Sequence, residues 1–228
     1  MGKIVGVVQA RTGSTRLPRK VLLEVEGYSA IELLFSRVKQ SVFVDEWWLA
    51  TTELDEDVVL SIVAKLSGLK VYKGSEENVH NRFCQIAYLS EADYLVRITG
   101  DCPFMDPMVI DYVVCTPGEW DYCSNIRPVR TFPDGLDVEV FSRRKLFSTA
   151  NSSSPEVQEH VTPGMYNEAD SHCVESVADF SHLRWTLDYR EDWNLIKACW
   201  KYFLPRRDFS WLEVLAWQTK YYPMSLWR

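Results

Sequence analysis

Short hydrophobic segments alternate with amphipathic segments through the first half of the chain. Residues 3–9 form a short run rich in β-branched side chains and bounded by polar residues, which is typical of a buried strand. After a polar loop, hydrophobic residues recur at spacings of three and four from Ile31 to about Gln40, which indicates an amphipathic helix. Ser29 and Glu32 match the capping box that begins a helix. The chain therefore opens with a predicted strand, loop and helix.

The same alternation continues to Thr99, with connections of only a few residues. It predicts a strand at 46–50, a helix at 56–67, a strand at 70–72, a helix at 79–90 and a strand at 94–99. Alternating strands and helices of this kind indicate an α/β fold, with a mostly parallel sheet covered by helices.

The pattern is less regular after Gly100. It predicts helices at 107–114, 143–149, 156–166, 191–203 and 210–220, and strands at 137–141, 173–177 and 183–187. No segment is rich enough in Gly, Ser or Pro to mark a linker, and no internal repeat is present. We expect residues 1–228 to form one α/β domain, with a regular half at 1–115 and an irregular half at 116–228.

Composition and charge limit the classes of function. The chain has 228 residues, with 25 Lys and Arg against 32 Asp and Glu and a formal net charge of −7. A general electrostatic attraction to nucleic acid is therefore not expected. No run approaches the roughly 18 apolar residues of a spanning helix, and the first residues do not match a secretory signal. We expect a cytoplasmic protein without membrane insertion.

The cysteines, histidines and tryptophans refine this description. The six cysteines contain no C-x-x-C pair and the four histidines show no metal-ligand spacing, so neither a disulfide framework nor structural zinc is expected. Many of the nine tryptophans lie toward the C-terminus, where they fill either a core or a subunit interface.

The loop after the first predicted strand concentrates positive charge. Residues 9–20 read QARTGSTRLPRK, without the G-x-x-x-x-G-K-[ST] or G-x-G-x-x-G phosphate motifs. In an open α/β sheet, ligands bind beyond the carboxyl ends of the strands, where this loop lies. Arg11, Arg16 and Lys20 would supply fixed charge to a phosphate chain, and backbone N–H groups near Gly13 would bind its oxygens. A solvated basic loop is the alternative interpretation.

Two aspartates follow predicted strands. Asp101 lies in RITGDCP and Asp188 in LRWTLDYRED. A carboxylate opposite a phosphate-binding loop is a suitable Mg²⁺ ligand. The structural alternatives are a cap on the following turn or helix for Asp101, and a capping box with Glu191 for Asp188. Together with the basic loop, the two carboxylates indicate metal-assisted phosphoryl chemistry.

These segments together resemble the cytidylyltransferases of the CMP-sugar synthetase group, the spore coat polysaccharide biosynthesis type most closely and the CMP-Kdo and CMP-sialate synthetases more distantly. The resemblance spans most of the chain through QARTGSTRLPRKVL (9–22), RITGDCPFMDP (97–107), PDGLDVEVF (133–141), EHVTP (159–163) and TLDYREDW (186–193). Arg19 stands where the family often has Gly, and Tyr189 and Arg190 stand where it commonly has Thr-Pro.

The resemblance implies a nucleotide-diphospho-sugar transferase-like fold, a Rossmann-like three-layer sandwich around a mostly parallel sheet. It implies that CMP passes from CTP to an acidic sugar or related acceptor, with Mg²⁺ and release of pyrophosphate, for surface polysaccharide or glycoconjugate precursors. Residues 1–115 would then bind the nucleotide and residues 116–228 the acceptor, in a homodimer.

The resemblance also assigns residues to roles. The nucleotide-binding residues would be Ala10, Arg11, Thr12, Gly13, Ser14, Arg16, Lys20, Thr99, Gly100 and Asp101. The catalytic residues would be Arg11, Lys20, Asp101 and Asp188, with both aspartates as metal ligands. In this mechanism an acceptor hydroxyl attacks the α-phosphorus of CTP in line, and its proton passes either to water or to Asp188.

The acceptor-side candidates come from the irregular half. Asp137 and Glu139 share one face of a predicted strand and suit sugar hydroxyls, or else face solvent from an edge strand. Arg127 and Arg130 suit the carboxylate of a sugar acid, or else belong to a solvated loop. His160 suits an acceptor carboxylate or phosphate, or else is a structural histidine.

Two rival functions stay open at the level of sequence. One is a nucleotidyltransferase with another base or with a phosphosugar or phosphonate acceptor. The other is a catalytically silent binding protein of the same fold. The presence of all the charged groups that the mechanism needs argues against the second, because a scaffold has no evident need for that set.

Overall fold

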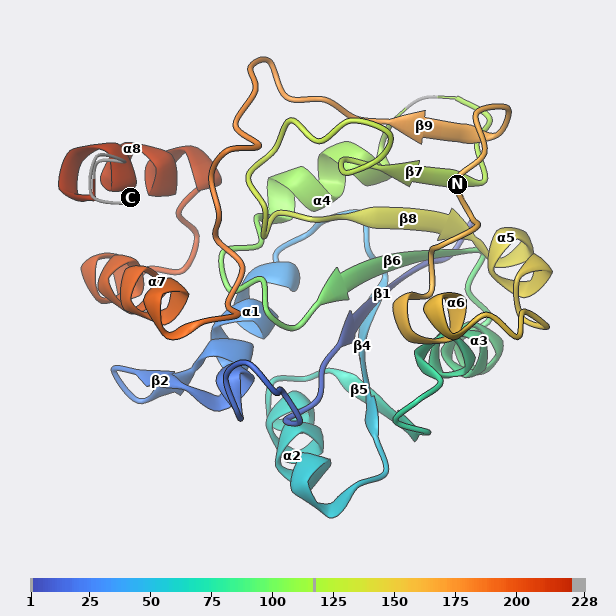
Figure 1. The fold of residues 1–228 in the computed structure, drawn as a ribbon, viewed down its shortest axis with the longest axis horizontal. Coiled ribbons are helices and arrows are strands. Elements are labelled where there is room, and N and C mark those ends of the chain that lie inside the picture. Colours follow the sequence, from blue (N-terminus) through green and yellow to red (C-terminus); the bar gives the residue numbers. More distant parts are fainter. Residues whose placement is uncertain (1, 117, 223–228) are drawn as a thin grey trace.

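The computed structural model describes residues 2–116 and 118–222 (Figure 1). The strands are β1 (Ile4–Gln9), β2 (Glu24–Val25), β3 (Tyr28–Ser29), β4 (Glu46–Thr52), β5 (Lys70–Gly74), β6 (Tyr94–Thr99), β7 (Tyr122–Ser124), β8 (Glu139–Ser142) and β9 (Ser171–Cys173). The α-helices are α1 (Ala30–Val38), α2 (Val58–Leu66), α3 (Val79–Ser90), α4 (Pro107–Val114), α5 (Arg143–Ser148), α6 (Pro155–His160), α7 (Arg190–Phe203) and α8 (Trp211–Tyr221). Two short 3₁₀ helices are η1 (Lys20–Leu22) and η2 (Asp55–Asp57).

Seven strands form one mixed sheet in the order β5-β4-β1-β6-β8-β7-β9. β5, β4, β1 and β6 run parallel, as expected for alternating strands and helices. β8 pairs antiparallel with both β6 and β7, and β9 returns parallel to β7. The predicted α/β fold is confirmed, and both halves of the chain contribute strands to the same sheet.

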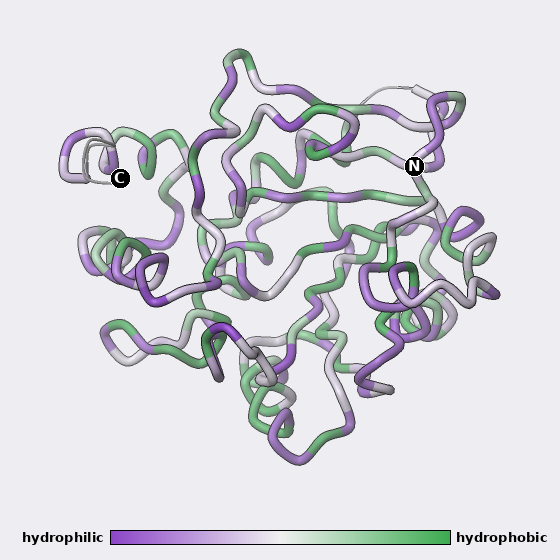
Figure 2. Tube along the Cα trace, viewed as in Figure 1, coloured by the Kyte–Doolittle hydropathy of each residue, from purple (hydrophilic) through white to green (hydrophobic). Residues whose placement is uncertain are grey.

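Helices cover both faces of this sheet (Figure 1). On one face, α1, α2, α4, α7 and α8 pack a large hydrophobic cluster that includes Leu34, Ile110 and Ile196. On the other face, α3 and α5 pack a smaller cluster that includes Phe83 and Leu146. Hydrophobic residues accordingly follow the central strands and hydrophilic residues gather in the connections (Figure 2). Within the described ranges, no helix is long and apolar enough to cross a bilayer.

The predicted strand at 183–187 is wrong. This segment makes one isolated bridge, between Asp134 and Arg184, and no ladder. Trp185 and Leu187 are both fully buried, so the alternation in the sequence reflects core packing of an extended segment. Burial and strand pairing produce the same hydrophobic pattern, which explains the error.

Two further elements are shorter than predicted or displaced. The helix predicted at 156–166 ends at His160, because Val161 adopts a positive φ of 68° and Pro163 follows closely. The strand predicted at 173–177 is β9, which ends at Cys173. β7 and the small β2–β3 hairpin were not predicted, because two or three residues are too short to show a period.

Aromatic side chains near the C-terminus fill the larger core. Trp185 and Trp200 are fully buried, and the ring of Phe104 lies 6.0 Å and 6.2 Å from them, measured between centroids. The indole N–H of Trp185 donates to Gln218 of α8 at 2.6 Å. These two tryptophans therefore belong to the core, and they fix the segment that leads to Asp188.

Arg37 of α1 ties the N-terminal half to the C-terminal segment. Its guanidinium is fully buried and donates to the carbonyl oxygens of Met105, Arg207 and Phe209 at 2.7, 2.9 and 2.9 Å. It also lies 4.2 Å over the ring of Phe209. Burial lowers the pKa of Arg37 to about 10. Three carbonyl groups and a ring, rather than a carboxylate, hold this charge inside the core.

Candidate active site

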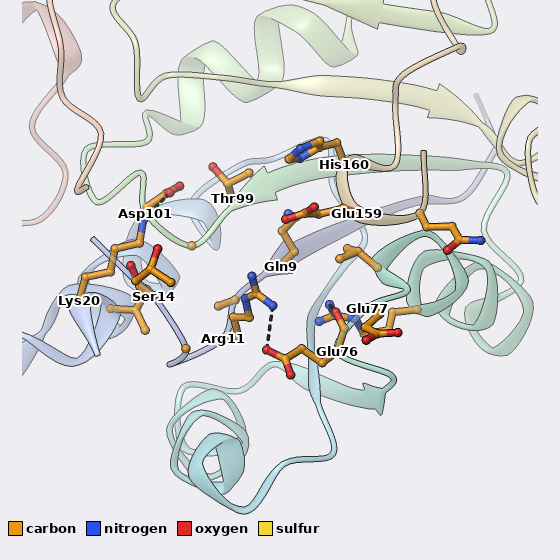
Figure 3. Close-up of a pocket in the computed structure, with 18 of the residues that line it drawn as sticks. Gln9, Arg11, Ser14, Lys20, Glu76, Glu77, Thr99, Asp101, Glu159 and His160 are labelled. Carbon is orange, nitrogen blue, oxygen red and sulfur yellow. Dashed lines mark hydrogen bonds and ion pairs between the residues drawn. The ribbon is translucent and has the colours of Figure 1, made fainter. Parts of the chain in front are cut away.

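A cavity of about 800 Å³ opens at the carboxyl ends of β1 and β6 (Figure 3). The loop after β1, the segment around the start of α3, the end of β6 and helix α6 all contribute to its wall. Figure 3 shows Arg11 and Glu76 on one side of the cavity, and Thr99, Glu159 and His160 on another. The location agrees with the rule that ligands of open α/β sheets bind beyond the strand ends.

The structure brings most of the predicted nucleotide-binding residues to this cavity. Those that line it are Ala10, Arg11, Gly13, Ser14, Arg16, Lys20, Thr99, Gly100 and Asp101. Thr12 lies beneath the loop instead, where its backbone N–H and its hydroxyl both donate to Asp57 Oδ1 at 2.7 Å. Thr12 thus fastens the basic loop to η2 and does not face the cavity.

Gly100 sets the closest approach between β6 and the basic loop. Its N–H donates to the carbonyl oxygen of Gln9 at 2.8 Å. A Cβ atom on Gly100 would lie 2.7 Å from the Cβ of Ala10 and 3.0 Å from the Gln9 oxygen. A residue without a side chain permits this contact, which places Asp101 directly beside the loop.

Lys20 joins the two predicted metal ligands. Its Nζ lies 2.8 Å from Asp101 Oδ2 and 2.8 Å from Asp188 Oδ1. Asp188 does not line the cavity itself, and it reaches the site through this contact. Burial alone would lower the pKa of Lys20, but the two carboxylates outweigh burial and the pKa is raised.

Asp188 lies among three cations. Besides Lys20, Arg16 donates to its Oδ1 at 2.8 Å and Arg184 to its Oδ2 at 2.9 Å. Burial would raise the pKa of Asp188, but hydrogen bonds and charge from these cations outweigh it, with Lys20 first, and the pKa is lowered. Asp188 is therefore held in its ionised form.

The structural alternatives for the two aspartates do not describe their contacts. Asp192, and not Glu191, accepts the N–H groups of Asp188 and Tyr189 at 2.8 Å, so the alternative of a capping box between Asp188 and Glu191 is wrong. The carboxylate of Asp188 binds the cations instead. Similarly, Asp106 rather than Asp101 caps α4, through the N–H of Met108 at 2.8 Å.

Asp101 and Asp188 fit a divalent cation. One ammonium group already lies within hydrogen-bond distance of both carboxylates, so their oxygens converge on a single point. Carboxylate oxygens are the protein ligands that Mg²⁺ prefers, alongside phosphate oxygens and water. Within residues 2–116 and 118–222, no cluster of three or more His, Cys, Asp or Glu side chains forms a fuller metal site.

The predicted acceptor-side arginines do not line the cavity. Arg130 pairs with both carboxylate oxygens of Asp137, with 2.8 Å between Nη2 and Oδ2, and it also lies 3.8 Å from Asp134. Arg127 lies in the connection after β7, where its N–H donates to Ser124 at 3.2 Å. Neither side chain is part of the cavity wall.

His160 and Glu139 have different positions. His160 lies on the cavity wall beside Glu159 (Figure 3). Glu139 is buried on β8, where Arg97 and the hydroxyl of Tyr122 bind it. The alternative of a solvent-facing edge strand is wrong, because β8 lies between β6 and β7.

Arg82 contributes to the cavity wall from α3, and the sequence patterns did not indicate it. The side chain is almost completely buried, and within the described residues its Nε has no hydrogen-bond partner. Burial, with a smaller contribution from the charge of Arg11, lowers the pKa of Arg82 to about 10. One feature of the sequence could have indicated Arg82: it is a basic residue in the first turn of a predicted helix, where the helix dipole disfavours positive charge.

A doubly covered α/β sheet, with a basic loop beyond its strand ends and two carboxylates that converge beside that loop, is the arrangement expected of a nucleotidyltransferase. Residues 5–174 match the family model described as "Cytidylyltransferase". The chain therefore belongs to the cytidylyltransferase family, and the enzyme class and the family predicted from the sequence are confirmed.

Individual relatives agree with this assignment. The chain is 31% identical over 227 residues to the spore coat polysaccharide biosynthesis protein SpsF of Bacillus subtilis, covering 95% of this chain and 94% of the relative. A solved cytidylyltransferase from Leptospira borgpetersenii is 30% identical, with a TM-score of 0.90 over 96% of this chain and 95% of that one. A CMP:2-keto-3-deoxy-manno-octonic acid synthetase complexed with CTP shares the fold, at 20% identity and a TM-score of 0.64, over 86% of this chain and 97% of that one.

Proposed function

We propose that this cytidylyltransferase transfers CMP from CTP to a hydroxyl group of a sugar acid, with Mg²⁺ and release of pyrophosphate. The observation that carries the proposal is the convergence of Asp101 and Asp188 on one cation, directly beside a loop of phosphate-binding charges. The likeness to SpsF over almost its whole length supports a product that serves surface polysaccharide synthesis.

The basic loop acts on the triphosphate. Arg11, Arg16 and Lys20 present their charges along one wall of the cavity, where they would hold the β- and γ-phosphates. As the acceptor oxygen attacks the α-phosphorus, the bond to pyrophosphate breaks and charge grows on the leaving group. Cations that already bind the phosphates stabilise that charge as it forms. A Mg²⁺ ion held by Asp101 and Asp188 would neutralise the phosphates and orient the acceptor hydroxyl.

The proton of the acceptor hydroxyl is assigned to water. Both oxygens of Asp188 already accept from cations, Oδ1 from Arg16 and Lys20 and Oδ2 from Arg184, so this carboxylate is poorly placed to take up a proton. Asp188 binds positive charge in this proposal and does not remove the proton.

The acceptor is placed on the side of α6. Glu159 and His160 face the cavity from the second half of the chain, whereas the basic loop and the end of β6 come from the first half (Figure 3). This arrangement supports one domain in which residues 1–115 mainly bind nucleotide and residues 116–228 mainly bind acceptor. Asp188 is the exception, because it reaches from the second half to the nucleotide side.

Location and assembly belong to the same proposal. All six cysteines are free thiols, as in a reducing compartment, and CTP is an intracellular metabolite, so we assign the protein to the cytoplasm. Exposed aromatic side chains on α7 and α8, such as Tyr202 and Tyr221, support a homodimer, because aromatic residues are enriched at interfaces.

Pyrophosphate release tests the proposed reaction. Purified protein is incubated with Mg²⁺, with CTP, UTP, ATP or GTP, and with a panel of sugar acids, neutral sugars, phosphosugars and phosphonates. We expect release with CTP and a sugar acid. Release with another nucleotide, or with phosphosugars alone, would favour the rival transferase. Binding of CTP without release from any acceptor would favour the silent binding protein.

A further inference from the structure

Polar side chains cross the floor of the cavity on neighbouring strands of the sheet. Arg97 of β6 lies opposite Glu139 of β8 in the antiparallel register. Two residues away on the same strands and the same face, Leu95 and Phe141 belong to the hydrophobic cluster under α3 and α5. This face of the sheet therefore changes from apolar to charged where the cavity begins.

Two residues that line the cavity, Gln9 and Arg97, form one hydrogen-bonded chain with two side chains buried behind them. Arg97 Nε donates to Gln9 Oε1 of β1 at 2.9 Å, and Arg97 Nη1 donates to Glu139 Oε2. The hydroxyl of Tyr122 on β7 donates to the other Glu139 oxygen at 2.6 Å. Burial, followed by the charge of Glu139, raises the pKa of Tyr122, so its hydroxyl keeps its proton. Both oxygens of Glu139 are thus used, and the carboxylate fixes Arg97 on the floor.

The groups left over on this floor are donors. Arginine has five N–H donors and no acceptor, so the amide of Gln9 must turn its oxygen to Arg97 and keep its NH₂ group for other partners. Within the described residues, neither Arg97 Nη2 nor Gln9 Nε2 makes a hydrogen bond, and both side chains line the cavity. A floor with donors alone suits a ligand group that only accepts, such as a carboxylate.

We propose that Arg97 binds the carboxylate of the acceptor, and that Glu139 and Tyr122 position its guanidinium for this contact. This inference rests on the proposed function and specifies how its acceptor is recognised. Arg11, Arg16 and Lys20 lie on the loop side for the phosphates, while Arg97 lies on the sheet, two residues before Thr99 on β6 and opposite Val7 of β1. Glu159 on α6 supplies an acceptor for sugar hydroxyls, which donate. The cavity then distinguishes a sugar acid from a neutral sugar.

A purely structural role of the pair between Arg97 and Glu139 does not account for all of the hydrogen-bond donors of Arg97. A buried ion pair is seldom more stabilising than apolar side chains of the same volume. Joining β6 to β8 would therefore not require Arg97 and Glu139. The second amino group of Arg97, which makes no hydrogen bond within the described residues, is the part that a structural link between strands does not use.

A matched pair of acceptors tests the inference. Each sugar acid of the panel, including 3-deoxy-manno-octulosonate, is compared with its amide, in wild type and in Arg97→Met. We expect wild type to prefer the acid by about 10- to 100-fold in kcat/KM, and Arg97→Met to lose this preference through a higher KM for the acid. Calorimetry should show that the Kd for CTP changes by less than about twofold.

Conservative variants separate positioning from folding. Glu139→Gln and Tyr122→Phe keep the shape of the floor and loosen Arg97, so each should raise the KM for the acid and leave the affinity for CTP unchanged. If Arg97→Met does not fold, these two variants test the proposal in its place. Arg37→Lys is the control, because this buried arginine holds carbonyl groups of the core and contacts no floor residue. It should lower the melting temperature and leave the preference for the acid intact.

Three results would overturn the inference. The first is that Arg97→Met and Glu139→Gln both keep the preference for the acid. The second is that both variants lose CTP binding. The third is that the wild-type enzyme uses amides or neutral sugars as readily as acids. Failure of the proposed function would look different, because wild type would then release no pyrophosphate from CTP with any sugar acid of the panel.

Discussion

Lys20 and Asp188 are 168 residues apart in the sequence, and the Lys20 ammonium lies 2.8 Å from the Asp188 carboxylate. The same ammonium lies 2.8 Å from Asp101, so it stands where a divalent cation would bridge the two aspartates. An ammonium and a metal ion repel each other at such short distances. Phosphate groups give Lys20 another partner, and the metal should therefore bind well only together with the nucleotide.

Metal binding measured without turnover tests this relationship. Titration of Mn²⁺ followed by electron paramagnetic resonance should show that CTP tightens metal binding by about 10-fold or more, with a reciprocal effect of metal on CTP. Without nucleotide, Lys20→Met should bind Mn²⁺ more tightly than wild type. Arg19→Met removes the same charge from an exposed neighbour and should not. Equal metal affinity in Lys20→Met and wild type would contradict the competition.

Loss of one carboxylate should reduce turnover without unfolding the protein. Asp101→Asn keeps the volume of the side chain and removes its charge, so kcat should fall by about 100-fold or more. The melting temperature should change little, because Asp101 caps no helix. The measurement is pyrophosphate release at saturating CTP and Mg²⁺, and unchanged turnover would remove Asp101 from its assigned role.

Gly135 controls the segment that carries Arg184 and Asp188. It has a positive φ of 109°, and a Cβ atom there would lie 2.7 Å from the carbonyl carbon of Trp185. Gly135→Ala should therefore lower the free energy of unfolding by about 2 kcal/mol or more in urea titrations, and should also lower kcat. Gly27→Ala is the matched control, since Gly27 also has a positive φ, of 81°, with no atom within 4 Å. It should show only the smaller effect of backbone strain.

Acid should weaken the contact between Lys20 and Asp188 by protonating Asp188, and base should weaken it by deprotonating Lys20. The pKa of Asp188 is lowered from 3.8, so its contribution to stability is present above pH 3.8 and is lost as pH falls through the lower, folded value. The pKa of Lys20 is raised from 10.5, so its contribution is present below pH 10.5 and is lost as pH rises through the higher value. The difference in unfolding free energy between wild type and Asp188→Asn should be constant near neutral pH and shrink in acid. A difference that persists unchanged at pH 2 would contradict this assignment.

Arg82 should contribute to nucleotide binding. Its buried side chain contributes to the cavity wall, and its Nη1 and Nη2 donate to the carbonyl oxygens of Ala50 and Glu76 at 3.3 and 3.4 Å. Within the described residues its Nε has no partner, and no carboxylate pairs with its charge, so an anionic ligand in the cavity would compensate its burial. Arg82→Met should weaken CTP binding by about 10-fold in calorimetry. Lys65→Met on α2, which removes a charge outside the cavity wall, should not.

The sequence predicted best the elements whose ends are marked chemically. The helix at 79–90 agrees with the structure at both ends, and Asn78 caps it through the N–H of Asn81. The helix at 107–114 likewise begins at Pro107 after the capping carboxylate of Asp106. The segment at 183–187 failed because core burial imitates the pattern of a strand, and no local signal separates the two.

The site was predicted where its charges are close together in the sequence. The basic loop and Asp101 could be expected at the strand ends from topology alone. Arg97 could be placed in a strand, but nothing local says that this part of the strand borders a cavity or that Glu139 is its partner. The pairing of Arg130 with Asp137 could not be predicted either, because a charge pattern does not show whether a side chain is available to a ligand or is already paired within the protein.

The three carbonyl partners of Arg37 have a consequence for synthesis on the ribosome. Arg37 leaves the exit tunnel early, whereas the carbonyl groups of Arg207 and Phe209 follow 170 and 172 residues later. Until they arrive, the guanidinium has to stay hydrated, since an unpaired charge is too costly to bury. The face of the nascent sheet under α1 therefore cannot become dry until Phe209 has also left the tunnel, so this part of the core closes only after most of residues 2–222 have been synthesised.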